Sequence, residues 1–376
     1  MKGYFRKRGN KWSFTIDIGT DPITGKRKQK SKSGFKTKKE AQAACAELIS
    51  DLNKGSYVEY DKQKIEGYLQ SWLEHTKHKI KESTFKNYSR AINKRIIPYL
   101  GQLNLSDLKT FHGQDLVDRM IKEGLSPTYI EYIITVLKNA VEYAVKTERI
   151  IKNPLVHVSI PRPRRRNYTT WSFEQVNKFL IYAKMDNPVY YICYSLALKT
   201  GMRKGEFLGL RWSDVNFESG NIQVTQTMTY DGVFTFSDPK TTNSVRTIAI
   251  DQDLITELKR HKAIQSQFKL AIGKGYNDHD LVCCREDGSP IYPRTLAFHF
   301  LSVIKKADIP IIRIHDMRHT HFTLLLELGE HPKIVSERAG HSSVKITLDV
   351  YSHVTPNMQQ ETASKFNNAI KNKKMS

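Results

Sequence analysis

The alternation of apolar and polar side chains near the N-terminus predicts a small β-sheet. Apolar residues occupy every second position in one stretch: Trp12, Phe14, Ile16 and Ile18. This two-residue period is typical of a half-buried strand. A turn sequence at residues 21–25 follows, and lysine then takes alternate positions at Lys26, Lys28, Lys30 and Lys32. We therefore expect a hairpin with one basic face.

The apolar period lengthens to that of a helix after residue 36. Thr37 and Glu40 have the spacing of a capping box, which starts a helix by pairing side chains with free backbone N–H groups. The inner stripe of this helix is predicted to comprise Ala41, Ala44, Cys45, Leu48 and Leu52, with Gly55 ending it. Residues 1–55 are expected to form a three-stranded sheet backed by one helix.

Helical periodicity also fills residues 62–157. Apolar residues recur at helical steps in several runs, among them Tyr68, Leu69, Trp72 and Leu73. Ser126 followed by Pro127 is typical of the N-cap and first residue of a helix, while Pro98 and Gly101 interrupt the pattern. We expect a compact helical domain whose apolar residues form its core.

Residues 158–170 have the composition of an extended basic linker. Two prolines disfavour a helix, and no acidic residue balances the arginines Arg162, Arg164, Arg165 and Arg166. Such charge suits a chain that follows a DNA backbone.

The rest of the chain is predicted to be mainly helical with a β insertion. Ser172 and Gln175 mark a capped helix, and residues 189–199 form an apolar one. Residues 221–229 and 245–250 are rich in β-forming residues and are separated by turn sequences, which indicates a β-hairpin insertion. We place one domain over residues 171–365 and a tail at 366–376. The fold class is multidomain α+β.

Composition indicates a polyanionic partner. The 376-residue chain contains 60 Lys and Arg against 38 Asp and Glu, a formal net charge of +22, and residues 1–55 carry +9 of it. Nucleic acid and an anionic membrane surface both suit such charge. No run approaches the ~18 apolar residues of a membrane span, and the N-terminus lacks the apolar centre of a signal peptide, so we expect a soluble cytoplasmic protein.

Several other classes of site are disfavoured. The cysteines Cys45, Cys193, Cys283 and Cys284 lack the spacing of a zinc site or disulfide framework, so we expect reduced, mostly buried thiols. No phosphate-binding loop of nucleotide hydrolases occurs. His315, His319 and His321 lie close in sequence, but Arg318 among them repels a cation, so we expect no metal there.

Three segments carry polar residues that are unusual for a helical domain. Residues 200–212 contain Arg203, residues 315–320 contain His315 and Arg318, and residues 339–341 end in His341, ten residues before Tyr351. In this order they match the motifs of the tyrosine recombinases, the phage integrase family. The resemblance spans residues 170–360, and the layout of the regions resembles phage and conjugative-element integrases with an N-terminal arm-binding domain.

The chemistry of phosphodiester cleavage explains these residue types. Catalysis must neutralise the charge that grows on the non-bridging oxygens, and Arg203 and Arg318 suit this task because guanidinium groups stay protonated and bind phosphate oxygens in pairs. A phenol with a pKa of about 10 needs a cationic environment and a proton acceptor to attack. His315, on nearly the same helical face as Arg318, can help remove the proton from Tyr351.

The resemblance implies the remaining roles. Lys240, in a predicted hairpin turn, matches the family's lysine that protonates the leaving 5′-oxygen. His341 matches a histidine that donates a hydrogen bond to the phosphate, while Glu206 and Asp316 are expected to support the arginine and histidine side chains. The family's reaction passes through a 3′-phosphotyrosyl linkage and requires no cofactor.

The resemblance also implies partners and a cellular setting. The expected partner is double-stranded DNA with core crossover sites and arm-type sites, bound by a homotetramer, together with a directionality factor or a host DNA-bending protein. No membrane is involved. The protein is expected to act at the nucleoid in the cytoplasm of a bacterial host, where it integrates and excises a phage or mobile element.

Three alternatives stay open on sequence alone. Residues 331–348 resemble a helix-turn-helix, so a non-catalytic DNA-binding regulator explains the charge but leaves Tyr351 unexplained. A type IB topoisomerase shares the tyrosine chemistry, yet it hardly needs an arm-like module. Lys199 and Lys204 compete with Lys240 for the role of general acid.

Overall fold

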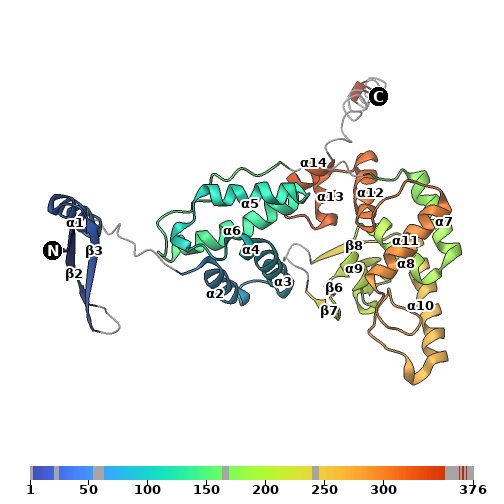
Figure 1. The fold of residues 1–376 in the computed structure, drawn as a ribbon. Helices are drawn as coiled ribbons and strands as arrows, with labels where there is room; N and C mark the ends of the chain where they lie inside the picture. The colour runs from blue at the N-terminus through green and yellow to red at the C-terminus, as the bar shows by residue number, and fades with distance from the viewer. Residues whose placement is uncertain are drawn as a thin grey trace. The chain divides into compact units, whose positions relative to one another are not determined.

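The computed structural model describes residues 3–20, 25–53, 63–162, 169–238 and 245–351, together with Ser364, Phe366, Asn367 and Ile370. The chain separates into two compact units, Met1–Arg165 and Arg166–Ser376 (Figure 1). Several predicted features lie outside the described residues: the turn at 21–24, the helix end at Gly55, the side chains of Arg164, Arg165, Arg166 and Lys240, and most of the tail at 366–376.

The N-terminal region is a three-stranded antiparallel sheet with one helix, as predicted. Its elements are β1 (Gly3–Arg8), β2 (Lys11–Thr20), β3 (Arg27–Phe35) and α1 (Lys38–Asn53), with β2 in the centre of the sheet. Phe14 and Ile16 of β2 are buried together with Ala41, Cys45 and Leu48 of α1. The strand period and the helix period of the sequence therefore meet in one small core.

Strand register decides which side chains share each face of this sheet. Paired residues point to the same face, and Lys32 pairs with Phe14. The alternating lysines of β3 therefore share one face, and it is the face that α1 covers. The opposite face carries polar side chains, such as Thr15 and Ser31, whose hydroxyl oxygens are 2.7 Å apart.

The second region of the first unit is helical. Its elements are α2 (Ile65–Lys77), α3 (Glu82–Ala91), the π-helical turn η1 (Ile92–Ile96), α4 (Ile97–Leu100), η2 (Leu105–Asp107), α5 (Thr110–Lys122) and α6 (Pro127–Lys146). The helix continues through Pro98, where the sequence predicted an interruption. A proline ring collides with the carbonyl four residues earlier, and the π-helical turn just before α4 widens the helix there. Gly101 follows the end of α4.

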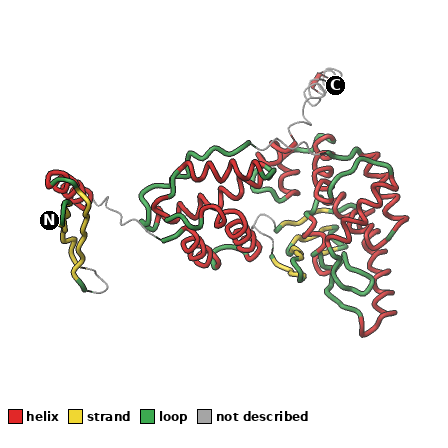
Figure 2. The backbone as a smooth tube through the Cα atoms, in the orientation of Figure 1, coloured by secondary structure: helices red, strands yellow, loops and turns green. Residues whose placement is uncertain are grey.

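The second unit is mainly helical with a small β insertion, as predicted (Figure 2). Its helices are α7 (Phe173–Asp186), α8 (Pro188–Thr200), α9 (Lys204–Leu208), η3 (Trp212–Asp214), α10 (Gln252–Ile272), η5 (Gly273–Gly275), α11 (Pro293–Ala307), α12 (Ile314–Glu327), α13 (Pro332–Ala339) and α14 (Val344–Tyr351). Its strands are β4 (Val215–Asn216), β5 (Asn221–Val224), β6 (Thr227–Tyr230), β7 (Phe234–Ser237) and β8 (Arg246–Ala249).

Predicted helix starts are confirmed by their caps. The Thr37 hydroxyl accepts from the backbone N–H of Glu40 at 3.2 Å. The Ser126 hydroxyl accepts from the backbone three residues on at 3.3 Å. Ser172 and Gln175 form a complete capping box at the start of α7. Each cap satisfies N–H groups that have no partner within the helix.

The β insertion differs in detail from the prediction. Residues 221–229 divide into β5, which pairs with β4 and β8, and β6, which pairs with the unpredicted β7. Side-chain hydrogen bonds lie at the break: the Gln226 amide donates to the Gly209 carbonyl at 2.6 Å, and the Thr225 hydroxyl donates to Asp214 at 2.8 Å. The break between β5 and β6 therefore lies where two consecutive side chains bond the preceding segment, 209–214.

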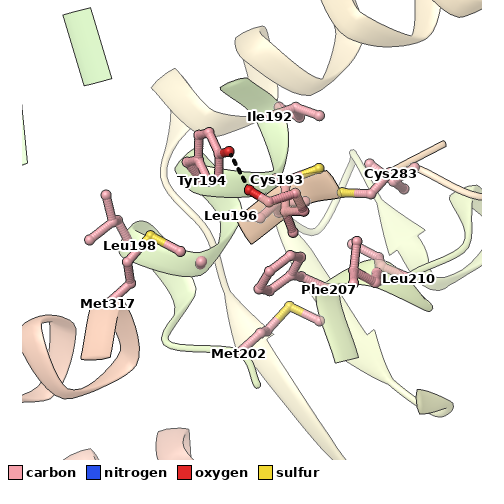
Figure 3. Close-up of a cluster of buried hydrophobic side chains, with 14 of the residues drawn as sticks. Ile192, Cys193, Tyr194, Leu196, Leu198, Met202, Phe207, Leu210, Cys283 and Met317 are labelled. Atoms are coloured by element: carbon pink, nitrogen blue, oxygen red, sulfur yellow. Dashed lines mark hydrogen bonds between the residues drawn. The ribbon is translucent and has the colours of Figure 1, made fainter. Parts of the chain in front are cut away.

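Helix α8 lies at the centre of the second unit. Its buried residues include Ile192, Cys193 and Leu196, so the helix is apolar on nearly every side. Figure 3 shows these side chains in one cluster with Phe207 of α9 and Met317 of α12. Because α9 and α12 both pack on α8, the segments that carry Arg203 and Arg318 share one close-packed core.

The four cysteines are buried free thiols. No helix within the described ranges combines the length and the apolar composition needed to cross a membrane. In the same ranges, no group of three His, Cys, Asp or Glu side chains is arranged to hold a metal ion.

Candidate active site

The segment that carries Arg203 begins where α8 ends. Gly201 follows α8 in the left-handed conformation, with φ of 68°, which glycine adopts without strain. A Cβ atom at this position would lie 2.6 Å from the His321 and Phe322 side chains of α12. Glycine therefore allows α8 to end directly against α12.

Arg203 is the N-cap residue of α9 and is held by Glu206. Its backbone N–H and its Nη1 donate to the two carboxylate oxygens of Glu206 at 2.9 Å and 2.7 Å. Burial raises the pKa of Glu206, but hydrogen bonds and charge from Arg246 and Arg203 outweigh burial and hold the pKa below its ordinary value. Glu206, expected to support Arg203, thus contacts it directly.

Helix α12 carries His315 and Arg318 one turn apart. Arg313 caps this helix, because its backbone N–H and its Nη2 donate to Asp316 at 2.9 Å and 2.7 Å. The described hydrogen bonds of the Asp316 carboxylate therefore go to Arg313, and not to His315.

Arg318 is almost completely enclosed by protein. The residue is 4% exposed. Its guanidinium lies over the Phe322 ring, 4.8 Å from the centroid. Nη1 donates to the Gly201 carbonyl at 2.6 Å, and Nη2 donates to the Ala339 carbonyl. Arg318 therefore connects the end of α8 to the end of α13.

Helix α13 ends in a Schellman motif. Gly340 adopts the left-handed conformation with φ of 63°. The N–H of Gly340 donates to the Glu337 carbonyl at 3.0 Å, and the N–H of His341 donates to the Ser336 carbonyl at 3.1 Å. The carbonyls of the next three residues are thereby left for partners outside the helix.

Three arginines from different segments bond these three carbonyls. The pairs are Arg246 with Arg338, Arg318 with Ala339, and Arg203 with Gly340, and the first and third span 2.8 Å and 3.3 Å. The C-terminal end of a helix carries negative partial charge, which favours cations. The end of α13 therefore brings three guanidinium groups together next to His341.

The two predicted site histidines are neutral at neutral pH. Loss of hydration and the charges of Arg318 and Arg203 lower the pKa of His341 to about 4. Its Nδ1 lies 2.9 Å from the Thr347 hydroxyl of α14. Loss of hydration and repulsion by Arg318 lower the pKa of His315. Neutral imidazoles can accept protons and donate hydrogen bonds.

Sequence reasoning missed Arg246 and Arg338. Arg338 donates through Nε to His321 Nε2 at 3.1 Å and through its Nη atoms to the carbonyls of Ala249 and Lys199, each at 3.0 Å. A signal for Arg246 was present, since it occupies an alternate position of β8 that shares a face with buried Ile248.

His321 is buried in a fixed orientation. Its Nδ1 lies 2.8 Å from the Leu198 carbonyl, and its Nε2 accepts from Arg338. Burial and the charge of Arg338 lower the pKa of His321 to about 3. Both ring nitrogens are engaged by protein groups, so His321 connects α12 to α8 and α13.

The other candidates are placed less completely. Tyr351 is the last residue of α14, the helix that follows His341. Lys240 lies in the sequence between β7 and β8, outside the described residues. Of its competitors, Lys199 donates to Glu257 at 3.0 Å, whereas Lys204 is exposed at the start of α9.

A cavity of about 780 Å³ opens beside this cluster. Lys204, Arg313, Asp316 and the neutral His315 line its polar side, and residues of α11 such as Phe300 and Leu301 line its apolar side. Lys204 and Arg313 are exposed at this edge of the candidate site, and Arg313 is paired with Asp316.

Known proteins match all three regions of the chain. Residues 4–52 match the Arm DNA-binding domain, residues 64–121 match the N-terminal SAM-like domain of phage integrases, and residues 170–358 match the Phage integrase family. The last match spans half of the chain and includes the arginine cluster. The chain belongs to the phage integrase family. Relatives are similar over nearly the whole length of this integrase.

This integrase is 29% identical to the ICEBs1 integrase of Bacillus subtilis (strain 168), over 96% of its own length and 97% of the relative's. It is 30% identical to a XerC-like tyrosine recombinase of Caldanaerobacter subterraneus subsp. tengcongensis, over 97% of each chain. The chain is therefore a site-specific tyrosine recombinase of the mobile-element integrase type. The regulator and topoisomerase alternatives are not favoured.

Solved integrase structures share its fold. The Tn1549 transposon integrase in complex with a circular intermediate DNA superposes with a TM-score of 0.68 at 22% identity, covering 80% of this chain and 99% of that one. The lambda integrase tetramer bound to a Holliday junction gives a TM-score of 0.59 at 18% identity, covering 93% and 94%. These likenesses support the α+β fold class predicted from sequence.

Proposed function

We propose that this integrase cuts and rejoins DNA by an attack of Tyr351 on the scissile phosphate, which Arg203, Arg318 and His341 bind. The observation that carries the proposal is the end of α13, where both arginines bond adjacent carbonyls next to His341. Two guanidinium groups side by side suit a phosphate, because each offers paired donors to its oxygens. Tyr351 ends the next helix.

The proposed reaction exchanges one phosphoester bond for another. The Tyr351 oxygen forms a bond to phosphorus, and the bond to the 5′-oxygen breaks, which leaves a 3′-phosphotyrosyl linkage and a free 5′-hydroxyl. His315 accepts the phenol proton, since its lowered pKa keeps the ring neutral. Lys240 donates a proton to the leaving 5′-oxygen. The reverse reaction rejoins a strand, and we assign no cofactor.

The three side chains proposed to bind the phosphate differ in what each needs in order to reach it. His341 donates from Nε2 when the Thr347 hydroxyl donates to Nδ1, and the lowered pKa keeps this contact free of added charge. Arg203 is partly exposed and available at the surface. Arg318 is enclosed, so we propose that it reaches a phosphate oxygen once the turn after α13 shifts on DNA. Glu206 and Asp316 hold the arginines beside them.

The N-terminal sheet supplies a second mode of DNA binding. We assign residues 1–55 to arm-type sites, with the open face of the sheet, which carries Arg6, Ser13, Thr15 and Ser31, directed at base edges in a major groove. The lysines of β3, and the lysine just before this strand, contact phosphates along the edge of the sheet: Lys26, Lys28, Lys30 and Lys32.

The remaining regions would bind the core site. We assign residues 62–157 to core-site binding, the linker at 158–170 with Arg162, Arg164, Arg165 and Arg166 to the DNA backbone, and residues 171–365 to catalysis. The chain after Ser352 is assigned to contacts with a neighbouring protomer. Arg162 is exposed. A homotetramer on two paired sites, aided by a directionality factor or a host DNA-bending protein, integrates and excises a mobile element at the bacterial nucleoid in the cytoplasm.

Covalent trapping tests the proposal. DNA fragments bound covalently by the protein are sequenced to define the core site, which is then made as a nicked substrate that releases a short 5′-hydroxyl strand on cleavage. Wild-type protein should give an adduct that survives boiling in detergent, and Tyr351→Phe should give none. Tyr230→Phe, at an exposed tyrosine of the same unit, is the matched control. An adduct formed by Tyr351→Phe contradicts the assignment.

A further inference from the structure

Arg246 is a buried arginine for which the proposed reaction has no direct use. Its side chain is 6% exposed, and that of its partner Glu206 is 3% exposed. Removing a guanidinium group from water is costly unless its hydrogen bonds are replaced. Arg246 therefore needs fixed partners, and their identity indicates its role.

Two hydrogen bonds of Arg246 lead to different parts of the site. Nη2 donates to Glu206 Oε2 at 2.9 Å, the same oxygen that accepts the backbone N–H of Arg203. Nε donates to the Arg338 carbonyl at 2.8 Å, at the end of α13. One planar group thus joins the carboxylate that holds Arg203 to the helix end that presents His341.

Arg203 is less firmly held by its own contacts. Its side chain is 37% exposed, and its Nη2 donates to the Gly340 carbonyl at 3.3 Å, which is long for such a bond. Its other guanidinium bond goes to Glu206. The position of the Arg203 side chain therefore depends on where the Glu206 carboxylate lies.

We propose that Arg246 is a positioning residue for phosphate binding: it fixes Glu206, and through it Arg203, relative to the end of α13 and His341. The inference rests on the proposed function, since it assigns Arg203 and His341 to the phosphate. Arg246 begins β8, where it pairs with Val224 of β5, so the sheet fixes its backbone. Its sequence position, six residues after Lys240, also places the anchor directly after the segment that carries the general acid.

A guanidinium group suits this role better than an ammonium group. The fork of arginine offers donors in two fixed directions, whereas lysine offers a compact charge on a flexible stem. Arg246→Lys keeps the charge beside Glu206 but loses the fixed link to the Arg338 carbonyl. This substitution therefore separates the charge of Arg246 from its geometry.

The test compares two linkages at the scissile position of the nicked core substrate. One is the ordinary phosphodiester, and the other is a methylphosphonate, in which a methyl group replaces a non-bridging oxygen and removes the negative charge. Single-turnover cleavage is measured with saturating DNA. A correctly placed arginine matters for the charged linkage and much less for the neutral one, because the neutral linkage develops less charge.

Arg246→Ala should cleave the phosphodiester about 100-fold more slowly than wild type, since displacement of a reacting group by about 1 Å has that cost. Its loss on the methylphosphonate should be about tenfold or less. Arg246→Lys should show the same preference for the neutral linkage with a smaller loss. DNA affinity should stay near that of wild type for both variants.

Arg211→Ala is the matched control. Arg211 also pairs with a buried carboxylate, donating to Asp214 at 2.8 Å and 3.1 Å, but its hydrogen bonds go to Asp214 and Thr225 and not to Glu206 or the end of α13. Its loss should affect both linkages equally. If Arg246→Ala does not fold, Arg246→Lys decides: a folded variant with equal losses on both linkages overturns the positioning role.

The same assay separates this inference from the proposed function. Tyr351→Phe and Arg203→Ala are measured in parallel. Cleavage by Tyr351→Phe, or a normal rate for Arg203→Ala, refutes the proposed function itself. If both behave as proposed while Arg246→Ala matches Arg211→Ala, the reaction stands and the role of Arg246 is rejected.

Discussion

The N-terminal sheet and the second unit both gather positive charge, but they hold it differently. In the sheet, Arg6, Lys28 and Lys32 are exposed. In the second unit, the side chains of Arg246 and Arg318 are buried and donate hydrogen bonds to carbonyl oxygens or carboxylates. Exposed charge attracts DNA from a distance and tolerates many geometries. Buried charge is costly to place and needs partners that replace its hydration.

This difference separates affinity from catalysis. An exposed lysine contributes through release of counterions from DNA, so its effect falls as salt rises. A fixed guanidinium stabilises charge that develops at one atom, and it needs no reorganisation when that charge appears. Substitutions in the sheet should therefore change binding, and substitutions in the arginine cluster should change rate.

The largest effect is expected for Arg203→Ala. It removes a charge proposed to contact the phosphate, so cleavage of the core substrate should slow by about 1000-fold at saturating DNA. Core-site affinity should stay near the wild-type value. Arg285→Ala, an exposed arginine of the same unit paired with Asp287 at 3.8 Å, serves as control. A loss of affinity as large as the loss of rate would break the distinction.

Lys240→Ala tests a cation proposed to carry a proton. Cleavage of an ordinary phosphodiester should slow by about 100-fold, because general acid catalysis typically contributes that much. A substrate with sulfur in place of the bridging 5′-oxygen should restore the rate, since a thiolate leaves without a proton. Lys204→Ala is tested in parallel, as it is exposed near His315. Recovery by Lys204→Ala instead would move the role to that residue.

The packing of His321 predicts a pH dependence of stability. Burial and Arg338 lower the pKa of His321 to about 3, below the ordinary value of 6.5. Between these pH values the unfolded chain binds a proton that the folded chain does not. The unfolding free energy should therefore fall by about 1.4 kcal/mol for each pH unit as pH decreases through that window.

His321→Asn isolates this contribution. Asparagine keeps a donor for the Leu198 carbonyl but does not titrate between pH 3 and pH 6.5. Urea unfolding at pH 7 and pH 5 should show a weaker pH dependence for the variant than for wild type. Equal pH dependence in the two proteins would show that His321 does not bind a proton on unfolding.

The smallest effects are expected in the sheet, where two double substitutions distinguish its faces. Arg6→Gln with Arg8→Gln, on the open face, should lower the preference for arm-site DNA over a scrambled duplex. Lys30→Gln with Lys32→Gln should weaken binding to the arm-site duplex and to the scrambled duplex by the same factor. It should also reduce the slope of log affinity against log salt by roughly 2. Fluorescence anisotropy over a salt series measures both. If the Lys30 and Lys32 variant loses sequence preference and the Arg6 and Arg8 variant does not, the base contacts are made by the β3 lysines.

Neither double substitution should change cleavage of the core substrate at saturating DNA. The sheet variants should thus change affinity without changing rate, the opposite of the result expected for Arg203→Ala. A slower rate for the sheet variants would indicate that arm contacts act on the chemical step as well as on binding.

Much of the fold was contained in local sequence. Alternation from Trp12 to Ile18 specified a strand, the pairs Ser126 with Pro127 and Ser172 with Gln175 specified helix starts, and both appear in the structure. These signals depend on neighbours within four residues. The break between β5 and β6 and the passage of a helix through Pro98 depend on hydrogen bonds and packing that no local period contains.

The sequence by itself determined the residue types of the candidate site and their order. These types suit the proposed tasks of phosphodiester cleavage, since arginine neutralises charge, histidine and lysine transfer protons and tyrosine attacks. Only the tertiary structure decided which groups hold these side chains in place. The carbonyls at the end of α13 meet arginines from β8, α9 and α12, which are far apart in the chain. Strand register likewise set the β3 lysines on the face that α1 covers. Such pairings arise from long-range contacts, which close only when the whole core packs.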